Sequence, residues 1–265
     1  MSIKSKVLAT AATLTLVGGV GMAGALTAGT ASAATPSAGP DAINLFSHQF
    51  GSFRSPNFTV DVYRQGEKVG QPIILFRQSN YDPALDWTVA FQGLVSDFLA
   101  AGLVSPALAL HYGCLYVSAT ATPSCINPAT GKGFFPDDPA FENEYAPFGV
   151  DSGLCLGLAA TASSDEGVTL QPCGVSSKTV WVLDTYDQYS FLTALRDGVP
   201  LINGSDTNFS QPFVLTYPNN GFPTDKPRPQ LVVTNLTGFS NGTGGPEVNS
   251  VNSSQLWGAT FGVLP

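Results

Sequence analysis

Between Leu154 and Trp181 the chain reads LCLGLAATASSDEGVTLQPCGVSSKTVW, and this stretch decides the fold. Three leucines alternate with smaller residues at its start, and a polar run that ends in Asp165-Glu166-Gly167 leads into a second apolar run, Val168-Thr169-Leu170. Alternation on both sides of a turn predicts two short strands in a hairpin. Trp181 follows on a third apolar run, where we expect its indole to be buried in a core.

Two other parts of the chain repeat this order. One runs from Phe58 to Trp87 and contains FTVDV, the polar turn QGEKVGQ, then PIILF and DW. The other runs from Val199 to Trp257 and contains VPLI, SQPFVLTY and QLW. The matching pair GQPIIL and SQPFVL, and the single tryptophan that closes each stretch, indicate a threefold internal repeat. We place the repeats at about 58–91, 152–184 and 199–262.

This pattern, with CLxL…GxxVxLxxC…W in the middle repeat, resembles the ricin-type β-trefoil lectin family in a degenerate form. The resemblance extends over 58–257 with large insertions, and the Gln-x-Trp signature is intact only at Gln255-Leu256-Trp257. It implies an all-β fold, a β-trefoil-like domain with three repeats and long loop insertions, which we place at 51–265 as a single domain. Hairpins closed into a short barrel leave no exposed sheet edge.

The resemblance also implies a carbohydrate-binding site. In this family an Asp at the end of the first strand accepts hydrogen bonds from sugar hydroxyls, and an aromatic residue after the next strand stacks on the sugar. The matching residues in the first repeat are Asp61 and Phe76, with Asn80 and Asp82 in the following loop. A carboxylate is a strong acceptor for hydroxyl groups, and an aromatic face packs against sugar C–H groups. The alternatives are an outward-facing strand residue for Asp61 and a core aromatic for Phe76.

The other repeats lack these groups. The second has Gly157 and Gln171 at the two places, and the third has Leu201 or Ile202 where Asp is expected. We therefore expect at most one sugar site.

The first 34 residues have the pattern of a bacterial secretory signal. Lys4 and Lys6 precede a long apolar run, and Ala31-Ser32-Ala33 supplies the small residues of a cleavage site. A retained membrane anchor is the alternative, but the glycines in the run and the cleavage site favour removal. We predict a signal peptide at 1–34, an extracellular protein, and no membrane span after removal. An N-terminal tether at 35–50 follows, although INLFSHQFGSF at 43–53 is aromatic enough to dock as an edge strand.

The charge balance restricts the partners. Without Lys4 and Lys6, 9 of the 11 basic side chains remain against 19 acidic ones, a net charge of −10. Nucleic acid and anionic membrane partners are therefore disfavoured. Low charge density, 28 glycines and 20 prolines fit one all-β domain with long loops.

The cysteines predict disulfides. All four follow the signal, and we expect Cys114 to pair with Cys125 and Cys155 with Cys173, because each pair closes a short loop in an oxidising compartment. No CxxC pair is present and the two histidines are far apart, which disfavours a zinc site.

The region between the first two repeats is ambiguous. The run GLVSDFLAAGLV fits either a short helix capped by Ser96 or a pair of strands. The acidic run at 137–144 has carboxylates that could bind calcium, but it lacks the donor spacing and turn glycine of an EF-hand loop, so we favour a solvated insertion. We predict no cofactor.

Signatures of catalysis are missing. There is no GxSxG motif, and the candidate bases are His48, near the start of the exported chain, and His111, beside a predicted disulfide, where we expect ordinary surface or packed histidines. A carboxylate pair for glycoside hydrolysis needs no fixed spacing in the sequence. We predict a secreted, non-catalytic, lectin-like protein that binds carbohydrate or a cell-surface glycan. The alternative is a protein-binding trefoil, such as a secreted protease inhibitor or surface interaction factor, that uses the loops at 131–145 or 217–245.

Overall fold

The computed structural model describes residues 43–52, 54–77, 86–113, 116–117, 123–124, 138–183, 198–218, 222–224, 228–237 and 251–261. The predicted signal peptide, residues 35–42 of the predicted tether, and Cys114, Cys125, Asn80 and Asp82 lie outside these residues. Within them, no helix combines the length and the apolar character that crossing a membrane requires.

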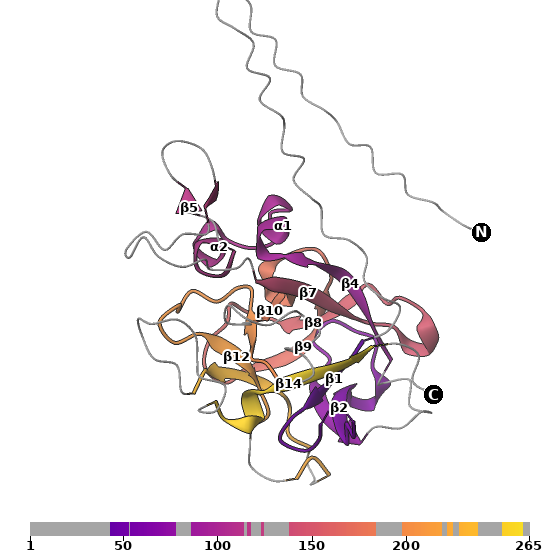
Figure 1. Ribbon diagram of the computed structural model, residues 1–265. Helices are drawn as coiled ribbons and strands as arrows, with labels where there is room; N and C mark the ends of the chain where they lie inside the picture. Colours follow the sequence, from indigo (N-terminus) through magenta and orange to yellow (C-terminus); the bar gives the residue numbers. More distant parts are fainter. Residues whose placement is uncertain are drawn as a thin grey trace, which may run out of the picture. The chain divides into compact units, whose positions relative to one another are not determined.

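Figure 1 shows how the strands are arranged. Apart from the short pair β5 and β6, the strands of the described residues form three successive units of four. The first unit contains β1 (Ile43–Ser47), β2 (Phe58–Val62), β3 (Ile73–Arg77) and β4 (Trp87–Leu94). The second contains β7 (Pro139–Tyr145), β8 (Leu154–Leu158), β9 (Glu166–Pro172) and β10 (Trp181–Leu183). The third contains β11 (Leu201–Asn203), β12 (Phe213–Thr216), β13 (Val232–Asn235) and β14 (Trp257–Phe261). Single turns of 3-10 helix lie at Tyr63–Gln65, Pro147–Gly149, Ser177–Thr179 and Ser253–Gln255.

The pairing of these strands is that of a β-trefoil. The fourth strand of each unit pairs antiparallel with the first strand of the next, as β4 with β7, β10 with β11, and β14 with β1. These six strands form the barrel. The second and third strands of each unit form a hairpin, and the hairpins meet one another through β9 and β13 and through a bridge between Pro72 and Thr169. The expected all-β trefoil is therefore confirmed.

The three tryptophans occupy equivalent environments, each at the start of a fourth strand. Their exposed fractions are 1% for Trp87 and 0% for Trp181 and Trp257. Each indole N–H donates to a backbone carbonyl of a second strand: Val60 at 3.1 Å, Leu156 at 2.9 Å and Leu215 at 2.7 Å. A buried indole needs such an acceptor, and here the threefold repeat supplies it. The predicted common role of the tryptophans is confirmed.

These three hydrogen bonds also correct the third repeat. Because Leu215 is equivalent to Val60 and Leu156, the second strand of the third unit is β12. The sequence VPLI, which we took as that strand, overlaps β11, the first strand of the unit. The match between GQPIIL and SQPFVL therefore compared β3 with β12, which occupy different places in their units.

The N-terminal boundary also moves. Residues 43–47 of the predicted tether form β1, which pairs with β14 along its whole length and with β2 at Phe46 and Thr59. The domain therefore includes them, and β1 is an inner strand rather than an edge strand. Alternating Ile43 and Leu45 contribute to the core, which explains why this segment pairs instead of remaining a tether.

The insertion between the first two units is helical. Helix α1 (Val95–Ala100) begins after Leu94, whose N–H is accepted by Asp97 Oδ2 at 2.9 Å, so Asp97 and not Ser96 caps it. Helix α2 (Pro106–Tyr112) is capped by Ser105, whose Oγ accepts the Leu108 N–H at 3.1 Å. A two-residue strand pair follows, β5 (Tyr116–Val117) with β6 (Pro123–Ser124). Buried side chains of α1 and α2, such as Phe98 and Leu108, form a second apolar cluster with Val180 and Val182.

The polar residue Asn143 lies among apolar residues of the barrel interior. The single pairings Phe46–Thr59, Glu144–Cys155 and Ile202–Val214 join the first and second strands of each unit at equivalent positions. One residue earlier on the first strands are Leu45, Asn143 and Leu201, all with an exposed fraction of 0%. Asn143 alternates with the core residues Phe141 and Tyr145, and its Oδ1 and Nδ2 have no hydrogen-bond partner among the described residues.

Candidate functional site

The β2–β3 hairpin places two of the predicted site residues on one face. Asp61 pairs with Ile74 and Thr59 pairs with Phe76, and directly paired residues share a face. The opposite face holds Val60, Leu75 and the other residues of the core. Asp61 and Phe76 are therefore diagonal neighbours on the face of the first hairpin that is turned away from this core.

The two residues differ in exposure. Phe76 is partly exposed, whereas Asp61 has an exposed fraction of only 4%, so its carboxylate is not an outward-facing strand group. The same face holds Thr59 and, from β1, Asn44 and Phe46, which are all buried. Thr59 Oγ and Asn44 Oδ1 have no hydrogen-bond partner among the described residues. Buried polar atoms normally have hydrogen-bond partners, so two atoms without one on the same face are unusual.

An arginine that the sequence pattern did not indicate completes this face. Ile74 bridges to Gln230, and the Leu231 N–H donates to the Ile73 carbonyl at 2.8 Å. The antiparallel segment therefore brings Arg228 level with Phe76, and Arg228 Cζ lies 4.0 Å from the centre of the Phe76 ring. Arg228 is far from the hairpin in sequence, so only the meeting of the first and third hairpins brings it here.

The equivalent place in the second unit is closed. Gly157 and Gln171 correspond to Asp61 and Phe76, as expected, because Leu156 pairs with Leu170 as Val60 pairs with Leu75. A Cβ atom at Gly157 would lie 2.8 Å from Thr179 Cγ2 and 3.0 Å from the Lys178 carbonyl oxygen. A side chain at this position would require the Thr179 side chain and the Lys178 carbonyl to move.

In the third unit the corresponding residues are Thr216 and Thr234, not Leu201 or Ile202. Their hydroxyl oxygens lie 2.9 Å apart, and Gln255 Nε2 donates to Thr234 Oγ1 at 2.9 Å and to the Asn235 carbonyl at 2.9 Å. Gln255 Oε1 accepts from the Thr237 N–H at 2.8 Å. The glutamine of the Gln-x-Trp signature therefore fills this place and links two strands instead of leaving it for a ligand.

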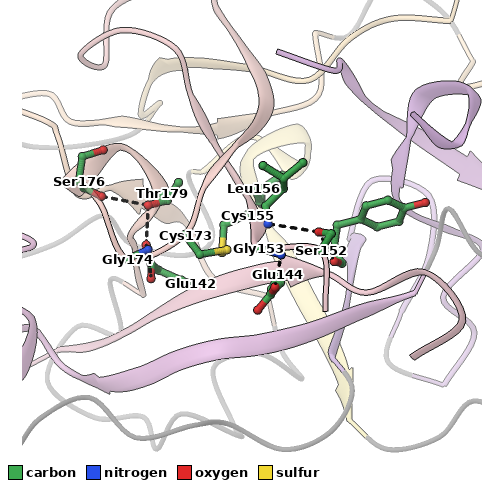
Figure 2. Close-up of a disulfide and its surroundings, with 12 residues drawn as sticks. Glu142, Glu144, Ser152, Gly153, Cys155, Leu156, Cys173, Gly174, Ser176 and Thr179 are labelled. Carbon is green, nitrogen blue, oxygen red and sulfur yellow. Dashed lines mark hydrogen bonds between the residues drawn. A yellow bond between two sulfur atoms is a disulfide. The ribbon is translucent and has the colours of Figure 1, made fainter. Parts of the chain in front are cut away.

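Most of the acidic run before the second hairpin lies in β7, and two of its glutamates accept hydrogen bonds from backbone N–H groups close to a disulfide (Figure 2). Cys155 and Cys173 are joined with their Cα atoms 5.1 Å apart, which confirms this predicted pair. Glu144 Oε1 accepts the Gly153 N–H at 2.6 Å, and both carboxylate oxygens of Glu142 accept the Gly174 N–H at 3.0 Å. The predicted solvated insertion is therefore wrong for 138–144.

Burial controls the ionisation of these glutamates. Burial raises the pKa of Glu142, while hydrogen bonds from Thr179 and Gly174 act in the opposite direction. Burial also raises the pKa of Glu144, and the Gly153 N–H opposes it. Their oxygens are already engaged by backbone N–H groups, and no set of three acidic, histidine or cysteine side chains suited to a metal ion occurs in the described ranges.

Comparison with known proteins finds likeness in fold only at a distance. No family model and no curated protein matches the chain. Among solved structures, a designed threefold-symmetric protein, ThreeFoil, has 10% identity and a TM-score of 0.44, with 83% of this chain and 97% of that chain covered. The agglutinin of Abrus precatorius has 11% identity and a TM-score of 0.26, with 86% and 98% covered.

A protein O-mannosyltransferase complex of S. cerevisiae, Pmt1-Pmt2 bound to the sugar donor, has 13% identity and a TM-score of 0.38. The match covers 87% of this chain and 27% of the mannosyltransferase chain. Scores this low say nothing about function, and the site must be judged by its own geometry.

Proposed function

We propose that this is a secreted, non-catalytic carbohydrate-binding protein whose single site is the outer face of the β2–β3 hairpin. One observation carries the proposal. The register places a carboxylate and an aromatic ring, Asp61 and Phe76, on one face of the first hairpin, while the matching places in the other two units are closed. Carboxylate acceptors and aromatic faces are the groups that recognise sugar hydroxyls and C–H surfaces.

Two further features support the proposal. The side chains of Asn44 and Thr59, which are themselves buried on the same face, keep the surroundings of Asp61 polar. The Cys155–Cys173 disulfide is consistent with an exported protein, as the predicted signal peptide requires.

Binding of the mature chain to a glycan array and to insoluble polysaccharides tests the function. Asp61→Asn and Phe76→Ala should each weaken binding, whereas Gln171→Ala, at the Phe76-equivalent place of the second unit, should not. Thermal unfolding of each variant separates lost binding from lost folding. If a folded wild-type chain bound no glycan, or if Gln171→Ala weakened binding as much as Phe76→Ala, the proposal would be wrong.

Protein binding is the second candidate, because one turn presents bare apolar side chains. Phe148 has an exposed fraction of 82% and Val150 of 66%, and the Phe148 N–H is held by Asp86 Oδ2 at 3.1 Å. A protease-inhibition panel tests this candidate. Phe148→Asn removes the ring, and asparagine tolerates the left-handed backbone at this position, where φ is 57°. Inhibition that this variant abolishes would favour protein binding over the lectin function.

A further inference from the structure

The proposed carbohydrate site presents a positive charge where it is accessible. Asp61 has an exposed fraction of 4%, whereas Phe76 and Arg228 are partly exposed and Arg77, the next residue along β3, is exposed. A ligand that approaches this face therefore meets a guanidinium before it meets the carboxylate. This is unexpected in a chain with 19 acidic and 11 basic side chains.

Arg228 is held in place by backbone and by a ring. The bridge between Ile74 and Gln230 and the Leu231 N–H bond to Ile73 fix its segment beside β3. Its guanidinium carbon lies 4.0 Å from the centre of the Phe76 ring, within the range of a cation–π contact. A guanidinium that packs on a ring still has its N–H donors in its own plane, and these donors match a carboxylate in bidentate geometry.

Within the described part of the chain, the contact of Arg228 is with this ring and not with a carboxylate. Arg228 is partly exposed, so a ligand can reach its guanidinium. The guanidinium also covers one face of the Phe76 ring, which remains partly exposed.

We infer that the ligand of this site is an acidic saccharide, a uronate or sialate, whose carboxylate binds Arg228 and whose ring lies against the partly exposed Phe76. The inference rests on the proposed function, since it names the class of sugar at the same site. It assigns charge selection to Arg228, and it leaves Phe76 as the support that orients the guanidinium.

Isothermal titration of the mature chain with an oligogalacturonide and with its carboxyl-reduced, neutral counterpart tests the inference. The acidic form should bind at least roughly tenfold more tightly, because a charge-assisted bidentate contact is lost on reduction. Arg228→Gln should remove this preference, so that the acidic and the neutral form bind the variant with equal affinity. Arg228→Lys should restore only part of it, since a lysine cannot make the bidentate contact.

Arg64→Gln is the matched control, because it removes the same charge from the turn of the same hairpin. Equal losses in Arg64→Gln and Arg228→Gln would show general charge attraction and overturn the assignment. Equal binding of both saccharides, unchanged in Arg228→Gln, would overturn the acidic class but leave carbohydrate binding intact. If a sulfated oligosaccharide bound more tightly than the oligogalacturonide, and bound Arg228→Lys as tightly as the wild type, the assignment of a carboxylate ligand would also be wrong. Failure to bind any saccharide would instead refute the proposed function.

Discussion

Replacing Asn143 by leucine should stabilise the protein. Asn143 shares its layer of the barrel with Leu45 and Leu201, its threefold equivalents, and all three have an exposed fraction of 0%. Its amide is the polar exception in this layer, and neither Oδ1 nor Nδ2 has a hydrogen-bond partner among the described residues. Asn143→Leu makes the layer uniform.

The expected gain follows from two opposing effects. A buried polar group without a partner costs about 1–3 kcal/mol, and the substitution removes that cost. Leucine has the same branching at Cγ as asparagine but bulkier terminal groups, and overpacking of a core costs about 1–3 kcal/mol where it occurs. Because shape is largely kept, we expect a net gain of about 1–2 kcal/mol, which raises the melting temperature of a domain this size by about 2–8 °C.

Urea unfolding followed by tryptophan fluorescence measures the gain, since all three indoles are buried in the same core. Asn143→Val, which is smaller, controls for overpacking, and Leu201→Asn is the converse control. Leu201→Asn should destabilise by roughly 3 kcal/mol or more, because it buries an amide in an apolar layer. If Asn143→Leu and Asn143→Val were both less stable than wild type, the amide would have a partner and the reasoning would be refuted.

Removing the Cys155–Cys173 disulfide as a Cys→Ala double variant should cost about 3 kcal/mol, from a sequence separation of 18, and should raise the urea m-value; an unchanged midpoint would contradict this. Phe in place of Trp87, Trp181 or Trp257 should cost similar amounts, about 1–3 kcal/mol each, since each loses the same hydrogen bond; one neutral site would break the equivalence. The pKa of Glu142 is raised by burial, so stability that is present below about pH 4.5 should be lost as the pH rises toward the folded-state pKa, and Glu142→Gln should flatten that part of the pH–stability curve. Gly157→Ala should destabilise, because its Cβ would meet the Lys178 carbonyl at 3.0 Å, and a chemical-denaturation midpoint equal to wild type would show that this backbone yields.

The hairpins and tryptophans were predictable because their signals are local. Alternating leucines in β8, a polar turn that ends at Asp165, and a tryptophan at a regular place are all read from neighbouring residues. The second-unit disulfide was predictable for the same reason, since it closes one hairpin. The strands that carry Asp61 and Phe76 were predictable in the same way, because they form one local hairpin.

The errors share a physical cause, which is that the deciding contacts are distant in sequence. The residues of β7 looked like a solvated acidic loop, because the partners of Glu142 and Glu144 are N–H groups at Gly174 and Gly153. Asn143 in the middle of the strand further disguised its apolar alternation. The third repeat was misaligned because β3 and β12 carry similar residues, and only the acceptor of the Trp257 indole distinguishes them.

The pairing of β1 with β14 also constrains when the barrel can form. Ile43 lies opposite Phe261, so β1 is completed only by β14, which is far away in the sequence. Hairpins such as β8–β9 can form early, whereas the barrel can close only after β14 has been synthesised, and contacts of this separation slow folding. Until then, the apolar side chains of β1 remain without the strand that pairs with it.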